Sequence, residues 1–183
     1  MAHVDKLINS GTHQRGFTIV ELLIVIVVIG ILAAITVVAY NGIQQRAQNS
    51  QTVAAVKDYE QMYIAYAVIH GVYPGAFTGN YCLGEGYTDG FCWDNRTYTT
   101  DTGIKVQLME VASSLPNPST VRVYRNATDG SRAGILYVNN YSLRYQLQGQ
   151  STECGLPGAT RSFTSGESQG PECNLKLPDP ATL

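Results

Sequence analysis

An uninterrupted apolar run is the feature that most constrains this chain. From Leu22 to Ala39 no residue is charged, and only one glycine and one threonine interrupt the aliphatic side chains. A helix of this length can cross the hydrocarbon core of a bilayer. The leader before it, residues 1–16, has two basic residues against one acidic one, which favours a cytoplasmic N-terminus. The run therefore predicts a membrane segment that places the rest of the chain outside.

Glu21 stands at the start of this run, where a carboxylate is costly. At the centre of a membrane helix the cost is roughly 2.5–3.5 kcal/mol, and it is lower near the interface. No lysine or arginine lies between Phe17 and Gln45 to pair with it. A cut between Gly16 and Phe17 would create an α-amine four residues before Glu21, cationic near neutral pH. That amine can pair with Glu21 on one helix or between neighbouring helices, which offsets the burial cost.

Two other interpretations of this N-terminus remain open. Glu21 can lie near the membrane surface, where its carboxylate reaches water without any partner. The apolar run can also be a secretory signal cut after Ala34, but the small residue Gly16 precedes the run instead of following it, and such a cut leaves Glu21 unexplained.

The stretch from Gly16 to Leu23, GFTIVELL, followed by the aliphatic run, resembles the class III signal of type IV prepilins, which pseudopilins of type II secretion and competence systems share. The resemblance covers about residues 15–45. It implies that a prepilin peptidase cuts after Gly16 and methylates the amine of Phe17, that Glu21 is the assembly glutamate, and that Gly30 gives the helix flexibility. This chain has Val38 where many pilins have a proline.

Beyond the apolar run, the pattern predicts an amphipathic helix that ends near His70. Apolar residues recur at steps of three and four, and no proline occurs between Phe17 and Val72. His70 and Gly71, with Pro74 shortly after, are typical of a helix end. The pair Asn41-Gly42 predicts a bend. The stripe consists of Ile43, Ala47, Val53, Val56, Tyr59, Met62 or Tyr63, Tyr66 and Ile69.

The remaining chain predicts a small antiparallel sheet. Spacing over 104–114 indicates a short helix, and three alternating runs, 121–126, 134–140 and 141–148, indicate a β-meander. The residues expected against the long helix are Val121, Val123, Ile135, Tyr137, Leu143, Tyr145 and Leu147. The predicted fold class is therefore α+β, a long N-terminal helix packed on an antiparallel β-meander, as in type IV pilins.

Four cysteines follow the predicted membrane segment, and none has CxxC spacing. An even count in that position predicts disulfides in an oxidising compartment, with free thiols in a cytosolic domain as the alternative. Four cysteines allow three pairings, of which proximity favours Cys82–Cys92 and Cys154–Cys173. The first closes a glycine- and tyrosine-rich loop, and the second would staple a tail, 149–183, that we expect to be a loop.

The first cysteine loop admits two interpretations. Trp93 can pack on the disulfide, or the aromatic residues Tyr81, Tyr87, Phe91 and Trp93 can form an exposed adhesive patch.

Motifs for catalysis and metal binding do not occur in the sequence. There is no phosphate-binding loop, zinc-peptidase helix, nucleophile elbow or calcium loop. The formal net charge of −2 provides no basic field for nucleic acid. We expect neither an enzyme nor a cofactor, a metal site or specific nucleic-acid binding.

These patterns give four segments: a cleaved leader (1–16), a membrane or filament-core helix (17–41), an amphipathic helix (42–70) and a globular pilin head (71–183). The resemblance implies a type IV pilin that polymerises into a helical filament with copies of itself and minor pilins, for adhesion, twitching motility or DNA uptake. It implies a prepilin peptidase, a platform protein and assembly ATPases as partners. The chain would lie in the cell membrane before assembly and in an extracellular pilus afterwards. The alternatives are a pseudopilin of a secretion or competence system, and a membrane-anchored extracellular binding domain or enzyme.

Overall fold

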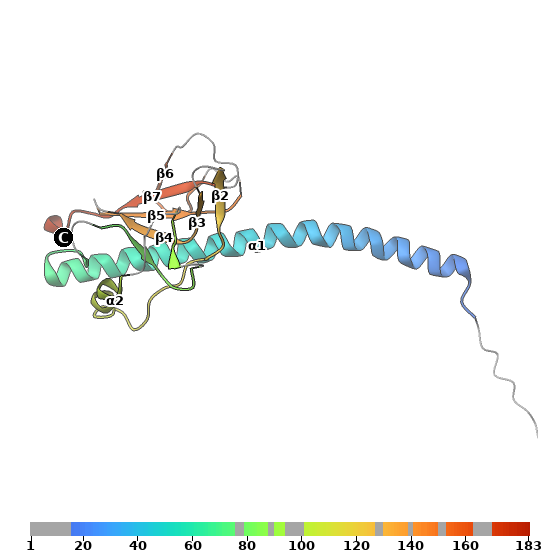
Figure 1. Ribbon diagram of the computed structural model, residues 1–183, viewed down its shortest axis with the longest axis horizontal. Coiled ribbons are helices and arrows are strands. Elements are labelled where there is room, and N and C mark those ends of the chain that lie inside the picture. Colours follow the sequence, from blue (N-terminus) through green and yellow to red (C-terminus); the bar gives the residue numbers. More distant parts are fainter. Residues whose placement is uncertain are drawn as a thin grey trace, which may run out of the picture. The chain divides into compact units, whose positions relative to one another are not determined.

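The computed structural model describes residues 16–75, 79–87, 90–93, 101–126, 130–138, 141–149, 153–162 and 170–183. The chain divides into two compact units, 1–41 and 42–183, and we call the second the C-terminal unit. Helix α1 (Ile19–His70) contributes to both (Figure 1). It continues as helix through Asn41-Gly42 and ends where the sequence predicts. Gly71 ends it with a φ of 72°, and its N–H donates to the carbonyl of Ala67 at 2.7 Å, a left-handed C-cap that favours glycine.

The main sheet has five antiparallel strands in the order β1-β4-β5-β7-β6. They are β1 (Tyr81–Leu83), β4 (Ile135–Val138), β5 (Ser142–Gln146), β7 (Glu172–Lys176) and β6 (Thr160–Ser162). The predicted α+β class with a long helix and an antiparallel sheet is confirmed. The hairpin of β4 and β5 is also confirmed, with Leu136 opposite Arg144.

The predicted three-run meander is wrong in its first strand. Strand β2 (Val123–Asn126) pairs with β3 (Gly130–Arg132) as a separate two-stranded ribbon, and β1 takes the edge of β4 instead. Val123 lies opposite Arg132 and Tyr124 opposite Ser131, so β2 uses the edge that faces it for β3 and is not part of the main sheet. Val121 is accordingly 44% exposed and does not face the helix. Val123 is buried, but outside the core under α1.

The tail is not only a loop, because it contains both β6 and β7. Strand β7 pairs with β5 on one side and with β6 on the other. Its sequence ECNLK alternates polar and apolar residues, which places Cys173 and Leu175 toward α1 and Asn174 on the opposite face. A short 3₁₀ turn, η2 (Pro180–Thr182), follows, with the Asp179 carboxylate accepting the N–H of Ala181 at 3.0 Å.

The short helix is also shorter than predicted. Asp101 is the N-cap of helix α2 (Thr102–Leu108), and its carboxylate accepts the N–H groups of Gly103 and Ile104. The residues after Leu108 form a turn, although Val111 and Ala112 still pack on the core. Tertiary packing, and not helix continuation, therefore explains their apolar spacing.

The main core lies between α1 and one face of the five-stranded sheet. Val56, Tyr59 and Tyr63 of α1 are almost fully buried against that face. The sheet residues in this core include Ile135, Tyr137, Leu143, Tyr145, Cys173 and Leu175, joined by Leu147 just after β5. Buried tyrosines also hold loops: Tyr59 Oη donates to the carbonyl of Pro116 at 2.9 Å, and Tyr145 Oη donates to that of Cys154 at 2.6 Å.

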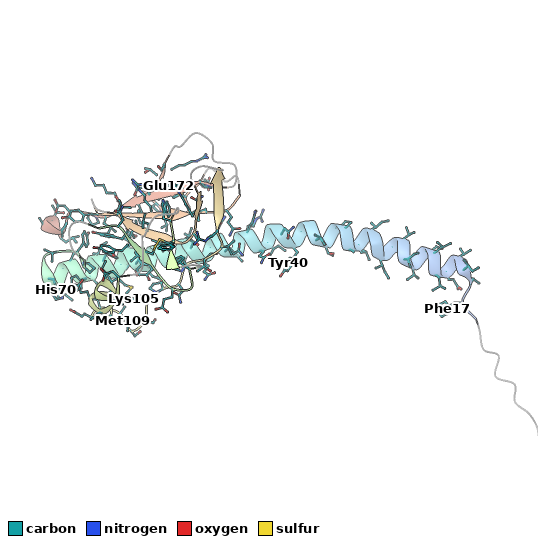
Figure 2. All side chains as sticks on the ribbon, in the orientation of Figure 1. Phe17, Tyr40, His70, Lys105, Met109 and Glu172 are labelled. Carbon is teal, nitrogen blue, oxygen red and sulfur yellow. A yellow bond between two sulfur atoms is a disulfide. The ribbon has the colours of Figure 1, made fainter. Side chains whose placement is uncertain are left out.

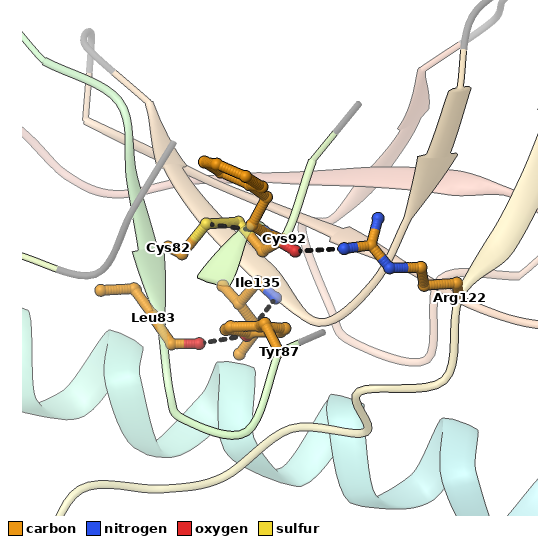
Figure 3. The surroundings of a disulfide bond; sticks show 7 residues. Cys82, Leu83, Tyr87, Cys92, Arg122 and Ile135 are labelled. Atoms are coloured by element: carbon orange, nitrogen blue, oxygen red, sulfur yellow. Dashed lines mark hydrogen bonds between the residues drawn. A yellow bond between two sulfur atoms is a disulfide. The ribbon is translucent and has the colours of Figure 1, made fainter. Parts of the chain in front are cut away.

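A second, smaller core covers the other face of the sheet around the Cys82–Cys92 disulfide (Figure 3). Tyr87 Oη donates to the carbonyl of Leu83 and accepts the N–H of Ile135 at 3.4 Å. Trp93 is only 3% exposed and packs in this core, so the exposed adhesive aromatic patch is wrong. The first cysteine loop is a packed layer on the sheet.

Candidate processing and assembly site

Residues 16–18 precede the first turn of α1 and have no regular secondary structure. Gly16 is exposed, and Phe17 is 81% exposed. The Gly16–Phe17 peptide bond therefore lies outside the helix. Phe17 is labelled at this end of α1 in Figure 2.

Thr18 and Glu21 form a reciprocal capping arrangement at the start of α1. The Glu21 carboxylate accepts both the N–H and the hydroxyl of Thr18, each at 2.8 Å, and the Glu21 N–H donates to Thr18 Oγ1 at 3.2 Å. This is the capping box of a T-x-x-E sequence. Sequence reasoning missed Thr18, although the spacing T-x-x-E before an apolar run is a readable signal. The box satisfies donors that a helix start leaves unpaired.

Helix α1 is apolar on every side between Leu22 and Ala39. Its aliphatic side chains are exposed in the isolated chain. The mean hydropathy of its most apolar stretch is 3.3. By length and composition this helix can cross a membrane. A helix that is hydrophobic all round requires lipid or other helices around it.

Gly30 lies within this apolar part of α1. A Cβ placed there would meet no atom within 4 Å, so packing inside the chain does not require a glycine. Glycine weakens a helix by roughly 0.5–1 kcal/mol relative to alanine. Thr36 Oγ1 donates to the carbonyl of Ala33 at 2.9 Å, which further perturbs a helix locally.

The structure brings the cysteines together as Cys82–Cys92 and Cys154–Cys173. Both bridges belong to the C-terminal unit, where the first joins β1 to the loop over the sheet and the second joins β7 to the segment before β6. Among the described residues, no group of three histidine, cysteine, aspartate or glutamate side chains is placed to hold a metal ion.

Residues 11–37 match the family described as the prokaryotic N-terminal methylation motif. This motif is the one by which the N-terminal segment resembles type IV pilins and pseudopilins. The motif covers the residues around Gly16, Phe17 and Glu21, the start of α1 and Gly30.

Three proteins are similar to this chain over part of its length. The chain is 41% identical over 65 residues to a fimbrial protein of Neisseria meningitidis serogroup B, which is 36% of this chain and 38% of that protein. It is 40% identical over 64 residues to the type IV major pilin protein PilE of Neisseria gonorrhoeae, 35% of this chain and 38% of that protein. It is 33% identical over 71 residues to the type II secretion system core protein G of Pectobacterium carotovorum, 39% and 46% of the two chains. This chain therefore spans less than half of each relative, and no solved structure matches it.

Proposed function

We propose that this chain is a structural subunit, a type IV pilin, that is processed at its N-terminus and polymerises into a filament. The observation that supports this most directly is a carboxylate at the head of a helix that is apolar on all sides, within a segment that matches the N-terminal methylation motif. The chain is also similar, over about a third of its length, to a fimbrial protein and a type IV major pilin. The leader, residues 1–16, is removed by a prepilin peptidase, which also methylates the amine of Phe17. The chain itself catalyses nothing.

The role of Glu21 follows from the cost of a carboxylate in an apolar environment. Before processing, the capping box with Thr18 satisfies part of its hydrogen-bonding capacity. After processing, the cationic amine of Phe17 on a neighbouring copy supplies a counter-charge for Glu21. Methylation leaves this amine cationic. This attraction brings copies together, and the apolar faces of their helices then contact one another in place of lipid.

The precursor is anchored in the cell membrane with residues 42–183 outside, and the assembled copies form an extracellular filament. Minor pilins, a platform protein and assembly ATPases take part in assembly. Gly30 provides local helix flexibility during the passage from membrane to filament.

N-terminal mass spectrometry tests the processing step. The expected mature chain begins with N-methylated Phe17. An intact Met1 would contradict the proposal and would favour a plain membrane anchor carrying an extracellular binding domain.

Substitution of Glu21 tests the assembly step. Glu21→Val is expected to enter the membrane at wild-type level, because an apolar residue replaces a charged one, but to yield no filaments. Glu21→Asp is the matched control that keeps a carboxylate, and it is expected to retain part of the yield. Normal filaments from Glu21→Val would show that the charge pairing is wrong.

A pseudopilin is the second candidate, and the similarity to the secretion protein of Pectobacterium carotovorum favours it. Pseudopilins form short fibres within a secretion or competence machine. Electron microscopy of the producing cells distinguishes the two, because only a pilin yields long surface filaments.

A further inference from the structure

Two surfaces in the described part of the C-terminal unit differ in shape and charge. One is a groove of about 660 Å³ beside the start of the amphipathic part of α1. The other is a set of exposed apolar side chains where α1 and α2 end. Both lie outside the apolar segment that the proposed function uses.

The first surface, the basic groove, has an apolar floor and a mainly cationic rim. The apolar lining residues, which we call the floor, are Val53, Ala54, Leu147 and Leu156. Arg46 and Lys57 stand exposed along α1, and Glu153 is the acidic residue on the opposite side. The groove thus has two cations against one carboxylate.

The second surface, the acidic patch, consists of Val68 and Ile69 of α1, Val106 of α2, and Met109 and Glu110 just after α2. Ile69 is 67% exposed and Met109 48% exposed. A contact of 3.1 Å between His70 Nε2 and Glu110 Oε2 places the ends of the two helices side by side, and Figure 2 shows His70 and Met109 at the same end of the unit. Glu110 supplies the carboxylate of this surface.

We propose that the acidic patch of one copy docks into the basic groove of a second copy. Apolar side chains of the patch fill the apolar floor, and Glu110 meets the rim cation Lys57. Charge complementarity selects this occupant, because the patch and the groove carry opposite net charge. The inference rests on the proposed function, since it describes how copies contact one another within the filament.

The contact joins two different surfaces of the same chain, so it is heterologous. Heterologous contacts that do not close into a ring generate open helical polymers. Ala54 and Ile69 are separated by 15 residues of one helix, so the contact staggers parallel copies by roughly 20–25 Å.

Charge reversal in the full-length chain tests this contact. Lys57→Glu and Glu110→Lys are each expected to lower the yield of sheared filaments about tenfold, because like charges then face one another. The double reversal is expected to restore most of the yield. Both side chains are exposed, so folding is not at risk. His70→Ala is the matched control, since it removes the contact within the chain but keeps the Glu110 carboxylate, and it is expected to assemble normally.

Disulfide crosslinking supplies the second measurement. Filaments of the variant with both Ala54→Cys and Met109→Cys are expected to give a ladder of covalent oligomers, because the new disulfides join neighbouring copies. Ala54→Cys combined with Lys176→Cys, on the sheet face away from α1, is expected to give none.

The outcomes separate this contact from the function on which it rests. Three outcomes would overturn the contact but leave the proposed function intact. The Ala54→Cys, Met109→Cys filaments could give no ladder, or the control pair could give an equal ladder. The double charge reversal could also assemble as poorly as the single reversals. A product crosslinked to another protein by Ala54→Cys alone would assign the groove to a different partner and would also overturn it. A wild-type chain that is processed but forms no polymer would remove both proposals.

Discussion

At the scale of single residues, the same Glu21 carboxylate is needed for a helix cap and for the proposed pairing with a neighbouring copy. In the structure it caps the first turn of its own helix through Thr18. In the proposed filament it also needs a cation from a neighbouring copy. A carboxylate has lone pairs for both, and the hydroxyl of Thr18 holds it at the helix start, where a neighbouring amine can reach it.

Removing this hydroxyl should weaken assembly without abolishing it. Thr18→Val eliminates the two hydrogen bonds that the Thr18 hydroxyl makes in the capping box, and the loss of an N-cap costs about 1 kcal/mol of helix stability. We expect a lower filament yield than wild type, but a higher yield than Glu21→Val. Thr18→Ser, which keeps the hydroxyl, is the control and should match wild type. Equal yields from Thr18→Val and wild type would show that the box has no role in assembly.

At the scale of elements, one buried ion pair connects three parts of the C-terminal unit. Arg132 of β3 contacts the Glu172 carboxylate of β7, and its guanidinium lies 4.8 Å from the centre of the Trp93 ring. Both charged side chains are buried. The pair therefore holds the two-stranded ribbon and the first cysteine loop against the outer face of the main sheet.

Breaking this pair on one side should be severe. Glu172→Gln leaves Arg132 charged and buried, which we expect to cost about 3–5 kcal/mol. Replacing both residues, as Arg132→Met with Glu172→Leu, should cost much less, because no buried charge remains. Urea unfolding in detergent checks this, with Trp93, the one tryptophan of the chain, as the fluorescent reporter. Equal destabilisation by the single and double changes would show that the pair contributes only packing.

At the scale of the whole molecule, stability depends on tyrosines buried through the main core and the second core. Burial raises the pKa of Tyr73 and of Tyr137 to about 12, with a smaller contribution from nearby Asp179 at Tyr73. Burial also raises the pKa of Tyr59, Tyr63, Tyr87 and Tyr145 above the ordinary value. In the folded chain these hydroxyls remain protonated at a pH where an unfolded chain has lost its protons.

Stability should therefore fall steeply in alkali. An unfolded tyrosine has a pKa of about 10, so the unfolded chain binds fewer protons above that pH, and the free energy of unfolding decreases as pH rises from about 10 toward 12. Circular dichroism and tyrosinate absorbance, measured together in a pH titration, should change in one transition. Tyrosinate formation well before the loss of structure would contradict this burial.

Reduction of the disulfides should also lower the melting temperature of the whole chain. The bridges span 10 and 19 residues of sequence, and loops of this size contribute about 3 kcal/mol each by restricting the unfolded chain. Calorimetry with and without a thiol reductant measures the change. An unchanged melting temperature would mean that the bridges do not contribute to stability.

What the sequence by itself determined about this protein is local. The apolar run, the isolated glutamate, the end of α1 at His70 and the β4–β5 hairpin follow from composition, helix period and turn chemistry, which act between residues near one another in the chain. The cysteine pairing favoured by proximity is the one that the structure contains.

Only the tertiary structure decided which strands pair and which faces stay open. Strand β7 lies between β5 and β6, although 25 residues separate its start from the end of β5, and β2 leaves the sheet although it precedes β4 closely. More than one strand can pair with a given sheet edge, and which strand does so depends on the side chains buried on both faces at once. For the same reason, the basic groove and the acidic patch could not be found from sequence, because each combines residues from distant segments.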